Sequence, residues 1–246
     1  MPDKPHSLVV GGTRGIGRVV AEHFASAGQK VSVIGRRVPE KPFPRGIRVW
    51  PVDLLDAVQL QTTLAAIIAL DGKLNSLVCL QRFKAEGDQW AGELATSLSA
   101  TRQIIEYLAG QFQPRQNNSI VLVSSAASTV IAAEQSAGYH VAKAGLNQLA
   151  RYYAVVLGAK GIRVNAVAPG TVLKPENQDF YLQNKKLRRL FRKTIPLGRM
   201  GTAAEIAEVI AFLSGPRASF VTGQILLVDG GVNLLSTETL ARTLAG

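Results

Sequence analysis

Short apolar runs alternate with longer segments of helical periodicity along most of the 246-residue chain. Seven runs are near-continuous in apolar residues and bounded by turn-forming residues, as in buried strands: 8–10, 31–34, 47–52, 74–80, 119–124, 162–168 and 224–228. Helical spacing predicts helices at 15–27, 56–70, 88–112 and 202–213, and another that carries residue 139 and runs to about 157. Strands that are apolar on both faces need a cover on each side. The alternation therefore predicts a single α/β domain over 1–246, built on a doubly wound parallel sheet of seven strands.

The segment at about 171–199 is the longest interruption of this alternation. Within it, Leu187, Leu190 and Phe191 fall at helical spacing. Residues 184–193 contain six basic residues and no acid. Two interpretations stay open: a helix with an apolar underside and a solvated cationic face, or a surface that recognises an anionic substrate. Such a substrate would be a phosphorylated or nucleotide-linked sugar, or an acyl group on an acidic carrier protein.

Composition narrows the class of partner. The chain has 28 basic and 17 acidic residues, a net charge of +11 that favours anionic partners. We do not expect nucleic-acid binding, because aromatic residues are not interleaved with the basic ones and no known binding module is present. No uninterrupted apolar run reaches 18 residues, so we expect no membrane span. Residues 1–6 do not resemble a signal peptide, and the single cysteine, Cys79, excludes an internal disulfide. These features fit a reducing compartment, most simply the cytoplasm. We assign no metal ligands.

A glycine-rich turn connects the first predicted strand to the first predicted helix. Residues 10–17 read Val-Gly-Gly-Thr-Arg-Gly-Ile-Gly. Free N–H groups at the start of a helix bind phosphate, and glycine lets the backbone approach it without a Cβ atom in the way. The turn therefore predicts a pyrophosphate site made by Gly11, Thr13, Arg14, Gly15, Ile16 and Gly17.

The end of the second predicted strand bears on which dinucleotide binds. An acid there binds the ribose 2′-hydroxyl of NAD, whereas an arginine accommodates the 2′-phosphate of NADP. This chain has Arg36 and Arg37, and Arg14 of the glycine-rich turn is within reach of the same phosphate. We therefore expect NADP(H), the other interpretation of the two arginines being solvation of a loop. Asp53, after the third strand, is placed to bond the adenine or to cap the helix that follows.

A tyrosine and a lysine four residues apart are the candidate catalytic pair. Tyr139 and Lys143 would lie on one face of a helix, where the ammonium stabilises a phenolate. A tyrosine held in this way can give a proton to a carbonyl oxygen or take one back. Ser125 precedes the pair, and its hydroxyl can hold the same oxygen, with Ser124 and Ser128 as nearby alternatives.

With these motifs in order, the chain resembles the short-chain dehydrogenase/reductase family from residue 8 to about 233. Residues 163–170 (Arg-Val-Asn-Ala-Val-Ala-Pro-Gly), 196–201 (Pro-Leu-Gly-Arg-Met-Gly) and 221–231 are similar to its later signatures. The resemblance implies a Rossmann fold, carbonyl–alcohol chemistry with NADP(H), and a homotetramer or homodimer. Tyr139 would be the proton donor or acceptor, Lys143 would bond the nicotinamide ribose, and Ser125 would orient the carbonyl. The implied cofactor contacts also include Asp53, Leu54, Pro169, Gly170 and Val172, and 171–199 would be the substrate loop or lid.

Several positions depart from the family pattern. The family closes its fourth strand with Asn-Asn-Ala-Gly, where this chain has Cys-Leu-Gln-Arg at 79–82. Gln81 and Arg82 are bulky, so we expect either a different backbone path or a different cofactor position. Ser97 stands where the family has a catalytic asparagine that anchors a water in a proton relay, and Lys174 stands where a threonine bonds the carboxamide. Two functions remain: an NADP(H)-dependent oxidoreductase, on an anionic or carrier-linked carbonyl such as a 3-oxoacyl group or a sugar derivative, or a weakly active or inactive NADP-binding regulatory or assembly protein.

Overall fold

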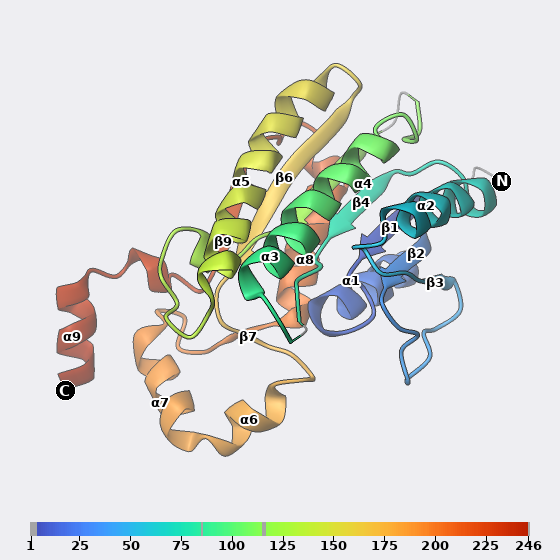
Figure 1. Ribbon diagram of the computed structural model, residues 1–246. Coiled ribbons are helices and arrows are strands. Elements are labelled where there is room, and N and C mark those ends of the chain that lie inside the picture. The colour runs from blue at the N-terminus through green and yellow to red at the C-terminus, as the bar shows by residue number, and fades with distance from the viewer. Residues whose placement is uncertain (1–3, 85, 115–116, 246) are drawn as a thin grey trace.

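The computed structural model describes residues 4–84, 86–114 and 117–245; three of the N-terminal residues discussed above, 1–3, lie outside this range. Seven parallel strands form one sheet in the order β3-β2-β1-β4-β5-β6-β9 (Figure 1). The strands are β1 (His6–Val10), β2 (Lys30–Gly35), β3 (Ile47–Pro51), β4 (Ser76–Cys79), β5 (Asn118–Val123), β6 (Ile162–Pro169) and β9 (Ile225–Val228). The predicted doubly wound α/β fold is confirmed.

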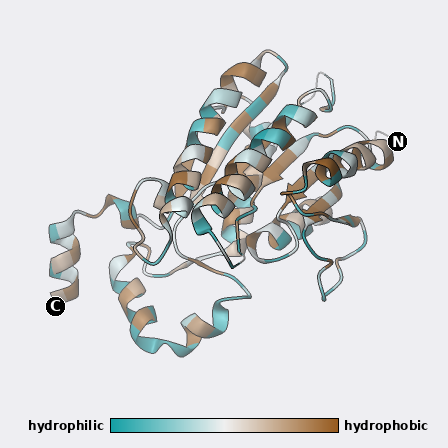
Figure 2. Ribbon diagram, viewed as in Figure 1, coloured by the Kyte–Doolittle hydropathy of each residue, from teal (hydrophilic) through white to brown (hydrophobic). Residues whose placement is uncertain are grey.

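Helices cover both faces of the sheet, and each cover has its own apolar core. On one face lie α2 (Ala57–Asp71), α4 (Ala100–Leu108) and α5 (Ala137–Gly158), whose buried residues pack in one cluster with those of the strands. On the other lie α1 (Gly15–Ser26) and α8 (Ala203–Ser214), with a second cluster. The central strands β1, β4, β5 and β6 are buried along most of their length, and most of the sheet is correspondingly apolar in Figure 2. Burial on both faces explains why these strands read as continuous apolar runs.

The predicted helix at 88–112 is wrong in its detail. The segment is helical in three parts: α3 (Gln89–Glu93), the π-helical turn η1 (Leu94–Ser99) and α4. A π-turn inserts one extra residue per turn and shifts the facing of the side chains before and after it. A shift of one residue within a single segment is too small a change in the apolar pattern for the sequence to predict the π-turn. After Leu108 the chain leaves the helix, and Leu74 forms an isolated bridge with Phe112.

The predicted lid segment forms an arm beyond the sheet. It contains the short strand β7 (Val172–Leu173), α6 (Gln178–Gln183) and α7 (Lys185–Thr194), and β7 pairs with β8 (Gly201–Thr202). The C-terminal helix α9 (Thr237–Ala245) lies outside the sheet core and contacts α7 (Figure 1). In the part of the chain that the structure describes, no helix is long and apolar enough to cross a membrane.

Candidate active site

Helix α5 carries Tyr139 and Lys143, and its start is fixed by local chemistry. The Ser136 side chain accepts a hydrogen bond from the Tyr139 backbone N–H at 3.2 Å, which caps the helix. Gly138 allows α3 to approach closely: a Cβ atom there would lie 2.8 Å from the Gln89 carbonyl oxygen. The capping and the close contact together place half-buried Tyr139 beside α3 and the loop that follows β4.

Lys143 is buried beneath the tyrosine. Its Nζ donates to the Val123 carbonyl oxygen at 2.8 Å, and it lies 5.6 Å from the centroid of the Tyr139 ring. Burial lowers the pKa of the Lys143 ammonium to about 8; the charge of Glu93 opposes the change, and the charges of Arg82 and Lys174 add to it. The predicted pair is therefore brought together, with a lysine that titrates closer to neutrality than a free one.

This lowered pKa predicts an alkaline limit to the chemistry. Lys143 carries its proton below pH about 8 and loses it as the pH rises through that value, so carbonyl reduction should slow there. NMR of isotopically labelled lysine side chains would follow the titration directly, with the Lys143 resonance assigned by its loss in Lys143→Met. A midpoint near the ordinary lysine value of about 10.4 would contradict the prediction.

The three candidate serines have different surroundings at the end of β5. Ser124 is buried, and its hydroxyl donates to the Lys143 carbonyl oxygen at 2.8 Å. The Ser128 hydroxyl accepts from the Asn147 side chain at 2.8 Å. Ser125 is partly exposed and caps the short helix η2 (Ala126–Ser128) by accepting from Ala127 N–H at 3.2 Å, which leaves its own proton for another acceptor. Ser124 is thus engaged as a donor, whereas Ser125 and Ser128 are not seen to donate to any of the described residues, and Ser125 stays the predicted donor to a carbonyl oxygen.

A charged cluster occupies the region where the family asparagine would stand. Glu93 is 1% exposed; it lies 3.4 Å from Arg82 Nε and accepts from the Ser97 hydroxyl at 3.1 Å. Arg82 stacks on Tyr139, with 4.3 Å between the guanidinium carbon and the ring centroid. Ser97, fully buried, therefore faces a carboxylate. Sequence reasoning missed Glu93, although its spacing of four residues from Ser97 puts both on one helix face and was a usable signal.

Gln81 does not divert the backbone. Strand β4 keeps its parallel register with β1 through Cys79, and Leu80 N–H donates to the Val10 carbonyl at 2.9 Å. The Gln81 side chain turns inward instead and donates to Thr101 Oγ1 at 2.6 Å. The backbone thus keeps the regular path of the strand as far as Leu80, and the Gln81 side chain reaches α4, while the alternatives of a different path beyond it or a different cofactor position stay a prediction.

The glycine-rich turn fits the pyrophosphate of a dinucleotide. It lies where the strand order reverses between β1 and β4, the place where ligands bind in open α/β sheets. A Cβ atom on Gly17 would lie 2.4 Å from the Gly11 carbonyl oxygen, and one on Gly11 would lie 2.7 Å from the Gln81 nitrogen. No side chain of the described residues caps α1 at Arg14, and its first turn contains no acid. Bare backbone N–H groups at a helix start are suited to an anion.

The end of β2 lies against this turn. Thr13 packs on Gly35, where a Cβ atom would be 2.5 Å from Thr13 Cγ2. Arg36 and Arg37 therefore follow beside the glycine-rich turn at 11–17, called the phosphate cradle below. Both arginines are exposed, and Arg36 donates to the Lys84 carbonyl oxygen at 3.1 Å. Burial lowers the pKa of the Lys84 ammonium, and the positive charges of Arg14, Arg82 and Lys174 lower it further. Cations therefore gather at the mouth of the cradle, although the sequence had not singled out Lys84.

Asp53 does not cap the helix that follows it. Its carboxylate accepts from Leu55 N–H at 3.0 Å, and the cap of α2 is Asp56, which accepts from Gln59 N–H at 2.9 Å. The capping alternative is thus wrong because the helix starts three residues later than Asp53 requires. Asp53 is exposed, while Leu54 beside it is buried.

The chain after β6 forms the other wall of the site. Gly170 N–H donates to the Val228 carbonyl at 3.0 Å, which ties the Pro169–Gly170 turn to β9, and Val172 is buried. Burial lowers the pKa of Lys174, and Glu176 opposes the change. The Glu176 carboxylate lies within 3.2 Å of the position a Gly15 Cβ would take, at the start of α1. The lid thus reaches across to the phosphate cradle.

Two further residues prove structural. Burial raises the pKa of the Cys79 thiol to about 12, so it is a packed apolar group rather than a nucleophile. His140 Nε2 accepts from Ala132 N–H at 2.9 Å while Nδ1 lies 2.9 Å from the Ser136 carbonyl oxygen. The imidazole holds the loop before α5 in place.

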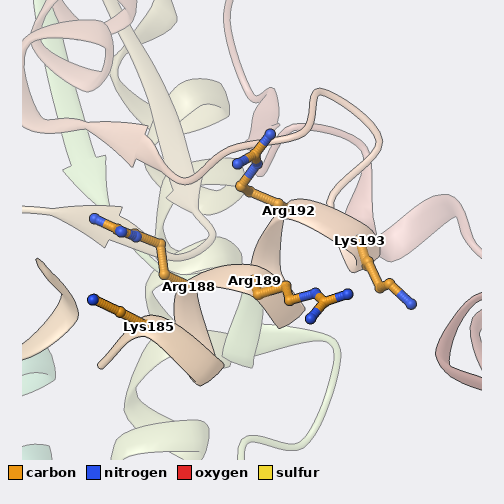
Figure 3. Close-up of a pocket in the computed structure, with 5 residues that line it drawn as sticks. All are labelled: Lys185, Arg188, Arg189, Arg192 and Lys193. Carbon is orange, nitrogen blue, oxygen red and sulfur yellow. The ribbon is translucent and has the colours of Figure 1, made fainter. Parts of the chain in front are cut away.

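Helix α7 presents a cationic pocket on the arm. Basic side chains line a volume of about 490 Å³, and Figure 3 shows them fanning out along the helix: Lys185, Arg188, Arg189, Arg192 and Lys193. Of the apolar residues between them, Leu187 and Phe191 are half-buried and Leu190 is exposed, and the Phe191 ring lies 5.8 Å from that of Tyr181. The predicted amphipathic helix is confirmed, and its basic stripe is open to solvent.

Comparison with known proteins agrees with this architecture. A family model described as enoyl-(acyl carrier protein) reductase matches residues 10–233. Senescence-associated protein 13 of Arabidopsis thaliana is 32% identical, over 95% of this chain and 93% of its own. A short-chain dehydrogenase/reductase structure from Serratia marcescens superposes with a TM-score of 0.82 at 26% identity, covering 94% of this chain and 99% of that one. The chain belongs to the short-chain dehydrogenase/reductase family.

Membership in the short-chain dehydrogenase/reductase family makes the chain an oxidoreductase that uses a nicotinamide cofactor. A tropinone reductase homologue of Arabidopsis thaliana is 31% identical over 93% of this chain and 92% of its own length. The aldohexose dehydrogenase of Thermoplasma acidophilum shares the fold, with a TM-score of 0.85 at 24% identity over 95% of this chain and 96% of that one. These relatives span different substrates, so the family alone does not select one.

Proposed function

We propose that the protein is an NADP(H)-dependent reductase of a carbonyl, or dehydrogenase of the corresponding alcohol, acting on an anionic or carrier-linked substrate. The observation that supports the proposal is the pair Tyr139 and Lys143 in the first turns of α5, with 5.6 Å between the ring centroid and Nζ, while Ser125 follows the carboxyl end of β5. The bound nicotinamide would supply or accept the hydride. Gly11, Thr13, Arg14, Gly15, Ile16 and Gly17 would hold its pyrophosphate, and Pro169, Gly170 and Val172 would border the nicotinamide.

In this proposal each of the candidate catalytic side chains has one role. The Ser125 hydroxyl donates to the carbonyl oxygen and stabilises its developing charge. The Tyr139 hydroxyl gives its proton to that oxygen, and the Lys143 ammonium stabilises the phenolate that results. Ser97, which donates to Glu93, would stand in for the family asparagine in the relay that returns a proton. The direct test is purified protein with NADPH and a panel of ketones, aldehydes and 3-oxoacyl thioesters, monitored by NADPH absorbance.

The alternative is a protein that binds NADP without turnover and serves as a regulatory or assembly subunit. It predicts NADPH binding with no oxidation across the same panel. The loss of the strand-four motif favours it, whereas the buried lysine beside the tyrosine favours the enzyme. Turnover above the no-enzyme rate that disappears in Tyr139→Phe would exclude this alternative.

Cofactor choice follows from the arginines after β2. We expect Arg36→Ala with Arg37→Ala to weaken NADPH binding by about 10- to 100-fold, because charge-assisted hydrogen bonds to a phosphate contribute about 1.5–3 kcal/mol. NADH binding, which lacks the 2′-phosphate, should change by less than about twofold. Titration calorimetry with both cofactors makes the comparison, and Arg217→Ala, an exposed arginine beyond α8, is the matched control. Equal affinity for both cofactors in the unsubstituted protein would refute the assignment.

Substrate charge should be recognised by α7. Acetoacetyl-coenzyme A and ethyl acetoacetate both carry a reactive ketone, but only acetoacetyl-coenzyme A carries phosphate groups. If the basic pocket binds the phosphates, Arg188→Glu with Arg192→Glu should raise KM for the thioester about 10-fold or more and leave KM for the ester unchanged. Added salt should raise the thioester KM in the unsubstituted protein. Parallel effects on both compounds would point to a lid with a solvated face instead.

Self-association is part of the proposal. Helix α5 exposes Tyr152, Val155 and Val156, and the edge strand β9 exposes Leu226 and Leu227. An unpaired edge strand and an apolar helix face are surfaces that a second copy can cover. Sedimentation velocity separates a homodimer or homotetramer from a monomer, and Val155→Asp should shift an oligomer towards the monomer.

A further inference from the structure

Arg82 is held against the candidate catalytic tyrosine from three sides. Its guanidinium carbon lies 4.3 Å from the centroid of the Tyr139 ring. Its Nε lies 3.4 Å from Glu93 Oε1, and a terminal nitrogen donates to Gln135 Oε1 at 2.9 Å. These partners come from α3, from the loop before α5 and from α5 itself, so the arginine side chain has little freedom to leave the ring.

Glu93 is the anchor of this arrangement. It is a buried carboxylate that none of the roles implied by the family uses. Besides Arg82, it accepts from Phe83 N–H at 3.3 Å and from the Ser97 hydroxyl at 3.1 Å. Its position at the end of α3, just before the π-turn η1, directs it to the loop after β4. A buried carboxylate in a site of net positive charge is retained at a cost in desolvation, which its cationic partner offsets.

The charges around the Tyr139 ring can be ranked by distance. The Arg82 guanidinium carbon is at 4.3 Å and the Lys143 ammonium at 5.6 Å from the ring centroid. The His140 ring is edge-on at 6.1 Å, with both nitrogens engaged by backbone groups. The charges of Glu93 and Lys174 act on Lys143. Of these groups, Arg82 is the cation nearest the ring, and arginine keeps its charge at all working pH values.

We propose that Arg82, fixed by Glu93, is a positioning residue that stacks on the Tyr139 ring and holds it in the orientation that proton transfer to the substrate requires. The inference rests on the proposed function, in which Tyr139 gives the proton. A planar guanidinium packs favourably on an aromatic face and keeps its charge at all working pH values. Arg82 thus fixes the tyrosine in a site whose usual strand-four motif and helix asparagine are replaced.

The test separates turnover from substrate binding. With a carbonyl compound that passes the panel, we expect Arg82→Met to lower kcat about 10-fold and to change KM by less than about twofold, because the tyrosine is misplaced while the cofactor and substrate contacts remain. Arg82→Lys should restore only part of kcat, since it returns the charge without the stacked plane. Arg217→Met, the control, should leave kcat and KM unchanged.

A second variant covers the possibility that Arg82→Met does not fold with Glu93 left unpaired. Arg82→Met with Glu93→Gln removes both charges, and kcat should still fall, because the guanidinium plane on the Tyr139 ring is absent in both variants. An unchanged kcat in every folded variant that lacks Arg82 would overturn the inference. Absence of turnover in the unsubstituted protein would instead sink the proposed function. NMR of labelled tyrosine rings would still decide the role of Arg82, since the Tyr139 ring, assigned by its loss in Tyr139→Phe, should flip faster without Arg82, and an unchanged flip rate would contradict the inference.

Discussion

Replacing Tyr139 by phenylalanine should reduce NADPH-dependent carbonyl turnover by about 10²- to 10⁴-fold, the range that a positioned general acid contributes. The substitution removes only the hydroxyl. The ring keeps its stacking contact with Arg82 and its place on α5, so folding and the phosphate cradle should be preserved. NADPH affinity measured by calorimetry is therefore expected to stay within about threefold of the unsubstituted protein, since no charge-assisted contact to the phosphates is lost.

Tyr152→Phe is the matched control for this loss. Tyr152 lies on the same helix, 57% exposed, and faces away from the site. It should retain full activity. Equal turnover in Tyr139→Phe and the unsubstituted protein would show that the proton comes from another group. A parallel loss of NADPH binding would show that the tyrosine acts through the cofactor site rather than through its hydroxyl.

The sequence predicted the sheet well because its signals are local. Each buried strand reads as an apolar run, and each run ends at turn-forming residues, so the order of elements and the place of the cradle at Gly11 to Gly17 could be inferred without the structure. Tyr139 and Lys143 were predicted for the same reason, since a spacing of four residues on one helix is a local property.

The parts that sequence could not give depend on contacts between distant segments. Arg82 reads as a bulky intruder after β4, and only the fold shows that it meets Glu93 and the Tyr139 ring. Gln81 likewise reads as an obstruction, although its side chain finds Thr101 twenty residues away. The π-turn is invisible in apolar periodicity, and Asp53 and Asp56 are equivalent as caps until the first helical residue is known.

These contacts change the meaning of the missing family motif. Asn-Asn-Ala-Gly is replaced by residues that bring their own polar partners: Gln81 with Thr101, and Arg82 with Glu93. The partners come from α3, η1 and α4, the helical segment that also carries Ser97. The loop after β4 is thus coupled to this helical segment through polar contacts, since a buried polar group needs a hydrogen-bond partner; Gln81 Nε2 has one, whereas Gln81 Oε1 has none among the described residues.

That coupling predicts an unequal effect of the two halves of the ion pair on stability. Glu93 is 1% exposed and Arg82 34%. Arg82→Met would strand a buried carboxylate, and we expect a loss of about 2–3 kcal/mol in the free energy of unfolding, below the range for a fully buried pair because Arg82 is partly solvated. For a chain of this length the loss corresponds to a fall in Tm of about 4–10 °C. Glu93→Gln should cost less, because Arg82 can turn to water and glutamine can still accept from Ser97.

The double variant tests whether Arg82 stabilises the buried Glu93 carboxylate. When Glu93→Gln is added to Arg82→Met, the unpaired charge disappears, so a second substitution should raise Tm above that of Arg82→Met alone. The matched control is the solvent-exposed pair Arg242 and Glu238, 80% and 75% exposed, whose cycle should give a coupling below about 0.5 kcal/mol. Thermal unfolding of the four proteins in each cycle gives both couplings. Simple addition of the two losses at Arg82 and Glu93 would mean that the carboxylate is not held by the arginine, and that the missing family motif is compensated in some other way.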